Sequence, residues 1–141
     1  MDRRLDTPFL ALRMGIGLTA ALAGIDKFFN LLANWTSYVS PVIAQLLPVS
    51  TTTFMGLVGL IELAVGLSVL MGWTRLGAYT ASAWLAVVAV NLVIAGFFDV
   101  AVRDLVMSIA AFTLARMAEV SAPTYAFNSI ITRAAHQRVG A

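Results

Sequence analysis

The sequence contains no cysteine and a single histidine, His136. The lack of cysteine excludes disulfide bonds, thiolate metal ligands and thiol redox chemistry performed by this chain itself. One histidine near the end of the sequence also argues against a multi-histidine haem or metal site. We therefore expect no metal site and no covalently bound cofactor. No nucleophile–base pair or nucleotide-binding fingerprint is present either, so no catalytic residue is predicted and an accessory role is favoured over an autonomous enzyme.

Charged residues are also few. Only 11% of the 141 residues are charged, whereas 60% are hydrophobic and the mean hydropathy is +0.90. Soluble domains carry roughly a quarter charged residues, and a short chain has too much surface to hide so many apolar side chains from water. The composition predicts one all-α domain embedded in a lipid bilayer. The net charge of +2 gives no indication of a nucleic-acid partner.

Four apolar stretches have about the length of 20 residues, or more, that a spanning helix requires. They cover residues 8–32, 54–73, 76–98 and 100–118, which predicts a four-helix transmembrane bundle. Thr7–Pro8 and Thr51–Thr53 indicate where the first two helices begin, and Ser121–Pro123 indicates the end of the fourth. Residues 33–50 contain Trp35, Tyr38 and two prolines, a composition typical of an ordered interfacial loop with a helical turn or two. Residues 124–141 mix apolar and basic side chains and predict a tail along the membrane surface.

The basic residues are distributed unevenly between the two predicted membrane faces. One face and its helix ends hold Arg3, Arg4, Arg13, Arg75, Arg116, Arg133 and Arg138. The other face holds Lys27 and Arg103. Because cytoplasmic segments are enriched in Lys and Arg, both termini are predicted to lie in the cytoplasm, with the protein in the plasma (inner) membrane and the 33–50 loop facing outward.

The charged residues inside the spans share helix faces with small residues. Steps of three and four connect Arg13, Gly17, Ala20, Gly24 and Lys27, then Gly59, Glu62 and Gly66, then Asp104, Ser108, Ala111 and Ala115. Small residues allow close helix packing, so these charges are expected to point into the bundle. The seven-residue spacing of Gly17–Gly24 and Gly59–Gly66 is likewise explained by helix packing.

Estimated depth divides the polar residues into two groups. Glu62 lies near the middle of its span and Arg13 is a cation within reach, so the two are predicted to form a structural ion pair. The second group should lie at the outer rim and form a candidate ligand site: Asp26, Lys27, Asn91, Asp99, Arg103 and Asp104. Three interpretations remain: ion pairs that fix helix register, a polar pocket beneath the aromatic loop for a quinone headgroup or similar molecule, and proton or ion conduction. Trp35 and Tyr38 fit an interfacial belt better than a ring-binding site.

The order of these features resembles the DoxX/DoxD-like family of four-helix membrane proteins. The likeness rests on Arg13 with Gly17 and Gly24, on 27–30 and 62–66, and on the stretch from Asn91 to Asp104 running into Arg116. It covers most of residues 8–118. The family is named for a subunit associated with thiosulfate oxidation coupled to quinone, so the resemblance implies a membrane subunit that accompanies an oxidoreductase. Relatives in thiol chemistry are a poor guide, because this chain has no cysteine.

Three functions follow as hypotheses. The first is a membrane subunit of a respiratory or sulfur-type oxidoreductase that helps bind or position quinone, with Lys27 and Arg103 as donors to a carbonyl oxygen. The second is a non-catalytic scaffold that docks partner subunits or forms a homo-oligomer. The third is a small transporter or channel. The lipid bilayer is a partner in each, and a quinone or a lipid is a candidate ligand.

Overall fold

The computed structural model describes the backbone of residues 3–139 and the side chains of residues 5–120. Within this range the chain is helical and contains no strand. Its elements are α1 (Arg3–Asp26), the 3-10 helix η1 (Trp35–Tyr38), α2 (Pro41–Leu46), α3 (Thr51–Leu70), α4 (Thr74–Ala95) and α5 (Phe98–Val139). Three helices are long and apolar enough to cross a membrane: α1 from Leu5, α3 and α4. The predicted all-α, membrane-type fold is confirmed to this extent.

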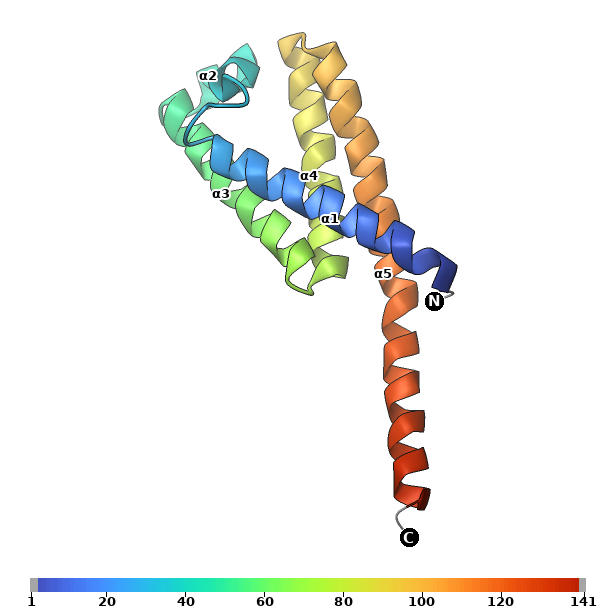
Figure 1. Cartoon of the computed structure of the whole chain (residues 1–141). Coiled ribbons are helices and arrows are strands. Elements are labelled where there is room, and N and C mark those ends of the chain that lie inside the picture. Colours follow the sequence, from blue (N-terminus) through green and yellow to red (C-terminus); the bar gives the residue numbers. More distant parts are fainter. Residues whose placement is uncertain (1–2, 140–141) are drawn as a thin grey trace.

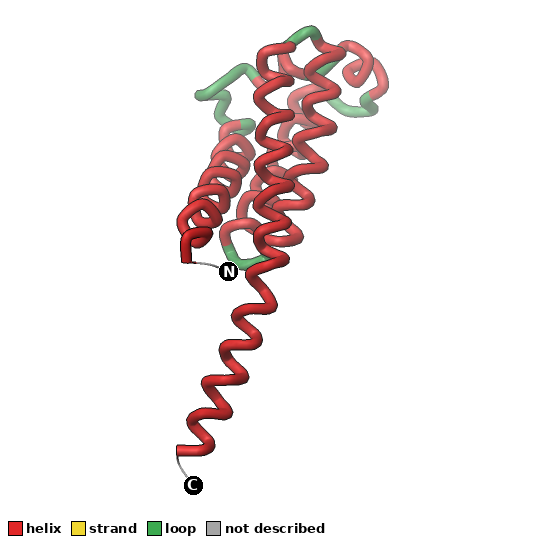
Figure 2. Tube along the Cα trace, turned by 90° about the vertical axis from the view of Figure 1, so that its right-hand side faces the viewer, coloured by secondary structure: helices red, strands yellow, loops and turns green. Residues whose placement is uncertain are grey.

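The long helices pack as two pairs. In Figures 1 and 2, α4 and α5 run side by side as an antiparallel hairpin, and Figure 1 shows α1 crossing the bundle beside α3. The segment with η1 and α2 lies over the end of the bundle where α1 ends and α3 begins. The C-terminal part of α5 extends beyond the other helices in both views. The fourth span at 100–118 lies within α5, and its crossing of a membrane stays a prediction.

Glycines bring α1 and α3 into direct backbone contact. A Cβ atom built on Gly24 would lie 2.6 Å from the Gly59 carbonyl oxygen, and one built on Gly66 would lie 2.7 Å from the Gly17 carbonyl oxygen. The two helices are antiparallel, so the glycines of α1 meet those of α3 in reverse order. The seven-residue spacing in both helices therefore reflects helix packing, as the sequence predicts.

The small-residue faces of the other helices are also buried. Ala78 and Ala81 of α4 face Ala111 and Ala115 of α5 in a core that also contains Val69, and these side chains are at most 3% exposed. Ser108 of α5 donates a hydrogen bond of 2.7 Å to the Ser82 carbonyl oxygen of α4. A separate cluster of Val39, Met55 and Val58 packs the η1–α2 segment against α3. The predicted inward faces of α1, α3 and α5 are confirmed.

Helix α1 differs from its predicted bounds at both ends. It begins at Arg3 and includes Pro8 in its second turn, where a proline removes the backbone hydrogen bond to the carbonyl four residues earlier. It ends at Asp26 rather than near residue 32. Asn30 adopts the left-handed conformation with φ 52°, and its N–H donates to the Asp26 carbonyl oxygen. Asparagine tolerates this conformation better than other side chains, so the chain turns away here.

The remaining boundaries shift by a few residues, with one large exception. Ser50 caps α3, since its hydroxyl accepts a hydrogen bond from the Thr53 N–H at 3.2 Å. Gly96, with φ +86°, ends α4 in the left-handed conformation that favours glycine. The predicted end of the fourth helix at Ser121–Pro123 is wrong, because α5 continues to Val139. The membrane-surface position of the 124–141 tail stays a prediction, and residues 140–141 lie outside the described residues.

Substitution of Gly66 by Ala tests the glycine contact. The new methyl group would lie 2.5 Å from the Ala21 backbone nitrogen, so α1 and α3 must separate. We expect Gly66→Ala to lower the free energy of unfolding by about 1–3 kcal/mol, measured by reversible unfolding in mixed micelles. The matched control is Gly15→Ala in α1, where nothing lies within 4 Å of the new Cβ. An equal effect of the two substitutions would contradict the proposed packing.

Candidate ligand pocket

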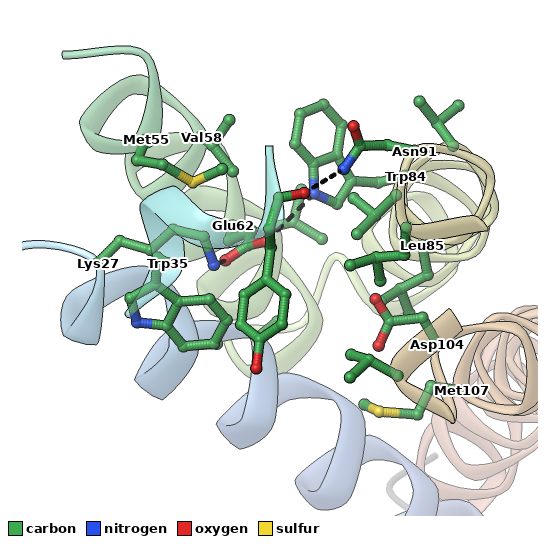
Figure 3. Close-up of a pocket in the computed structure, with 18 of the residues that line it drawn as sticks. Lys27, Trp35, Met55, Val58, Glu62, Trp84, Leu85, Asn91, Asp104 and Met107 are labelled. Atoms are coloured by element: carbon green, nitrogen blue, oxygen red, sulfur yellow. Dashed lines mark hydrogen bonds and ion pairs between the residues drawn. The ribbon is translucent and has the colours of Figure 1, made fainter. Parts of the chain in front are cut away.

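A cavity of about 290 Å³ lies inside the bundle, between α1, α3, α4 and α5 and beneath the η1–α2 segment. Its wall consists mainly of apolar side chains such as Ile16, Val58 and Leu85. Figure 3 shows the polar groups that project toward it from different helices. Ligand sites of small molecules are typically apolar clefts from about 300 Å³ upward that hold a few placed polar groups. The cavity has this character and lies near the lower size limit.

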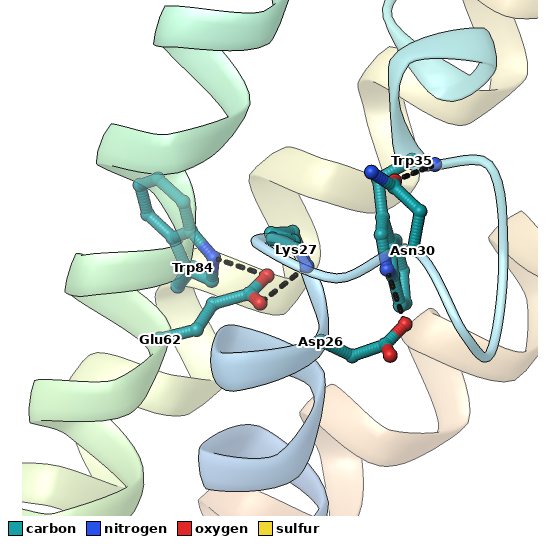
Figure 4. Close-up of polar contacts among 6 residues, drawn as sticks. All are labelled: Asp26, Lys27, Asn30, Trp35, Glu62 and Trp84. Atoms are coloured by element: carbon teal, nitrogen blue, oxygen red, sulfur yellow. Dashed lines mark hydrogen bonds and ion pairs between the residues drawn. The ribbon is translucent and has the colours of Figure 1, made fainter.

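The Lys27–Glu62 ion pair is the main polar feature of the cavity wall. Lys27 Nζ lies 2.5 Å from Glu62 Oε2, and the two side chains are 4% and 13% exposed. The Trp84 indole N–H donates to Glu62 Oε1 at 3.4 Å (Figure 4). Lys27 Nζ also lies 3.8 Å from the centroid of the Trp35 ring, within the range of a cation–π interaction. Each charge therefore has more than one partner in an apolar setting.

The predicted Arg13–Glu62 pair is wrong. Because α1 and α3 are antiparallel, Lys27, which directly follows the C-terminal end of α1, lies beside Glu62. Arg13 lies further toward the N-terminal end of α1, beside the last turn of α3. Arg13 donates instead to the carbonyl oxygens of Val69 at 3.0 Å and Leu70 at 2.7 Å. These carbonyls belong to the last turn of α3, where helical acceptors lack partners and a cation is favourable.

Asp26 supports the loop rather than the cavity. Its carboxylate accepts hydrogen bonds of 2.9 Å from the N–H groups of Leu31 and Leu32 and one of 2.7 Å from the Trp35 indole. Figure 4 shows Asp26 and Trp35 on the far side of Lys27 from Glu62. With the side chain of Asp26 buried, these three donors satisfy a carboxylate that would otherwise be costly to bury. The residue predicted to bind a ligand thus fixes the Trp35 ring over Lys27.

Asn91 attaches the same loop to α4. Its amide nitrogen donates to the Tyr38 carbonyl oxygen at 2.8 Å, and its amide oxygen accepts from the Ser40 N–H at 3.0 Å. The Tyr38 ring also meets Phe97 edge-on, with 4.8 Å between ring centroids. Asn91 borders the cavity, yet both polar ends of its side chain hold the loop. The segment predicted as an ordered interfacial loop contains η1 and α2, and it is hydrogen-bonded to Asp26 of α1 and to Asn91 of α4.

The other predicted rim residues separate into two places. Asp104 of α5 lines the cavity, and Figure 3 shows its carboxylate directed into it. Among residues 5–120 no side chain or backbone group donates a hydrogen bond to that carboxylate. Asp99 and Arg103 instead pair with each other at 3.1 Å on the outer surface of α5, with side chains 75% and 71% exposed. The structure therefore brings Lys27, Asn91 and Asp104 together and leaves Asp99 and Arg103 outside the cavity.

Trp84 was missed as a site residue, since a tryptophan in mid-span is typical of packing. The available signal was its indole N–H, which needs an acceptor when buried, and Glu62 is the acidic residue at similar depth. With Trp84 included, the cavity has one cation, two carboxylates and the aromatic rings of Trp35, Tyr38, Phe54 and Trp84. Within residues 5–120, no group of three or more His, Cys or acidic side chains is placed to hold a metal ion. The arrangement suits a small aromatic or polar headgroup.

Removing one or both members of the ion pair tests its structural role. Lys27→Met leaves the buried Glu62 carboxylate without its cation, so we expect a loss of about 3–5 kcal/mol in the free energy of unfolding. The double variant Lys27→Met/Glu62→Leu removes both charges and should recover most of that loss. Arg103→Gln, which breaks the exposed pair with Asp99, should change stability by less than about 1 kcal/mol. A double variant less stable than Lys27→Met would show that the two residues do not act as a pair.

Comparison of the chain with protein families, curated proteins and solved structures found no match in any of the three.

Proposed function

We propose that this chain is a membrane subunit of a redox enzyme complex and that its cavity binds the headgroup of a quinone. In this proposal α1, α3, α4 and the first half of α5 span the membrane, both termini are cytoplasmic, and the η1–α2 segment covers the cavity at the outer face. The observation that carries the proposal is the Lys27–Glu62 pair at the wall of a mainly apolar cavity inside the bundle. Charges at this depth are rare unless they serve a site or a tight pair.

The polar groups of the cavity match the two ends of a quinone headgroup. Lys27 has three N–H donors, of which Glu62 engages one, so protons remain for a carbonyl oxygen. Such a donor stabilises the negative charge that a carbonyl oxygen gains on reduction. Asp104 offers an acceptor for the hydroxyl group of the reduced form. The apolar wall and the rings of Trp35 and Trp84 suit the flat ring between them.

The accessory role follows from the chemistry that quinones require. A quinone gains or loses electrons only when a second redox group exchanges them, and the chain has no cysteine and a single histidine. We therefore propose that a partner subunit carries that group and that this chain positions the quinone. The likeness of residues 8–118 to the DoxX/DoxD-like pattern supports the same role.

Quinone binding can be measured through the cavity tryptophans. Trp35 and Trp84 line the cavity, whereas Trp73 is 74% exposed in the α3–α4 turn. In a Trp73→Phe background, a short-chain ubiquinone or menaquinone should quench the remaining fluorescence saturably in lipid nanodiscs. Adding Lys27→Met/Glu62→Leu should weaken binding roughly 10- to 100-fold, because a charge-assisted hydrogen bond contributes about 1.5–3 kcal/mol.

The matched control removes another opposite-charge pair, with Asp99→Asn/Arg103→Gln, and should leave the affinity unchanged. Quenching that never saturates, or that is equal in the cavity and control variants, would refute the quinone site. A stoichiometric partner recovered from native membranes, whose activity survives the cavity variant, would then identify the chain as a scaffold.

The lack of native cysteine permits a clean test of orientation. Gln45→Cys places a thiol on the exposed side of α2, and Met71→Cys places one in the α3–α4 turn, where Met71 is 79% exposed. In intact cells, a membrane-impermeant maleimide should label Gln45→Cys only. Met71→Cys should react after the membrane is permeabilised. The reverse pattern would show that the termini lie outside.

A further inference from the structure

A second polar site lies at the opposite end of the bundle from the η1–α2 segment, where α3 turns into α4. Here Glu119 of α5 accepts a hydrogen bond from the Tyr79 hydroxyl at 2.9 Å. Its carboxylate also pairs with Arg75 at 3.2 Å and with Arg116 at 2.5 Å. One carboxylate thus holds two guanidinium groups side by side, from α4 and from α5.

Both arginines face outward from this carboxylate. The side chains of Arg75 and Arg116 are 63% and 62% exposed, whereas that of Glu119 is 22% exposed. A guanidinium has five N–H donors, and the contacts with Glu119 use a minority of them. Two cations against one anion leave a net positive charge on this exposed surface.

An open hollow lies beside Arg75, and Arg116 shares the Glu119 carboxylate with that residue. The hollow has a volume of about 660 Å³ and is lined by Gly72, Trp73, Arg75, Leu76 and Tyr79. Trp73 and Leu76 are 74% and 69% exposed, so the hollow has an apolar margin as well as a charged one. Tryptophan next to the end of a spanning helix is typical of the headgroup region of a membrane.

We infer that this hollow binds the phosphate headgroup of an anionic phospholipid, with Arg75 and Arg116 as the phosphate ligands and Trp73 and Leu76 against the adjoining acyl chains. Guanidinium groups bind phosphate oxygens through paired charge-assisted hydrogen bonds, and basic pockets at the ends of spanning helices recognise lipid headgroups. The apolar margin favours a lipid over a soluble anion. The inference depends on membrane insertion and is independent of quinone binding.

Native mass spectrometry of the purified full-length protein tests this site. The protein, stripped of lipid in detergent, is incubated with phosphatidylglycerol or with phosphatidylcholine of the same acyl chains. We expect a clear preference for phosphatidylglycerol, with the variant Arg75→Gln/Arg116→Gln losing roughly fivefold in affinity per guanidinium removed. Arg75→Lys/Arg116→Lys keeps the charge and should keep most of the preference.

The control is Arg103→Gln, which removes an arginine of similar exposure at the other end of the bundle and should leave the preference intact. An unchanged preference in the double Gln variant, or an equal loss in the control, would overturn the site. If the Gln variant does not fold, Arg75→Lys/Arg116→Lys is compared with Arg103→Gln. A non-specific effect of net charge would lower the preference for phosphatidylglycerol in Arg103→Gln but not in the Lys variant, and that result would overturn the site. Displacement of the lipid by millimolar inorganic phosphate would overturn the lipid assignment in favour of a soluble anion.

Discussion

The direct backbone contact of α1 and α3 is the constraint on which the other features depend. At Gly24, Gly59 and Gly66 the two backbones are in contact, and at Gly17 the Leu70 side chain packs against the glycine, so added side chains at the three backbone contacts would force the helices apart. This contact places Lys27 beside Glu62 and Arg13 beside the last carbonyls of α3. The cavity lies between this pair and the α4–α5 hairpin.

Some polar residues of this bundle hold the segment that covers the cavity, and others project into the cavity itself. Asp26 and Asn91 use their side-chain oxygens and nitrogens to hold the η1–α2 segment, because buried polar groups need partners. Lys27, Glu62 and Asp104 then remain as the charges of the cavity wall. At the opposite end, Glu119 organises two outward-facing arginines in a similar way. The two ends therefore present opposite electrostatic character, an acidic balance within the cavity and a basic one at the α3–α4 turn.

Much of the fold could be predicted because it depends on composition and period. The helical class, the apolar helices α1, α3 and α4, and the inward faces that carry small residues all follow from hydropathy and from steps of three and four residues. The helix ends were less predictable: the left-handed Asn30 ends α1 early, and α5 continues through Ser121–Pro123, where the sequence indicates a helix end. Asp99 and Arg103 were assigned to the rim by depth alone, which does not say on which side of α5 they lie.

By itself, the sequence determined that the chain is a small helical protein suited to lipid and that its charges share faces with glycine and alanine, since both properties are local to each helix. Only the tertiary structure decided which charged side chains pair with one another. The pairing of Glu62 with Lys27, the attachment of the loop by Asn91 and the grouping of Arg75 with Arg116 depend on the antiparallel offset and rotation of packed helices. Those quantities arise from contacts between residues 26 to 57 positions apart, and the period of a single helix carries no information about them.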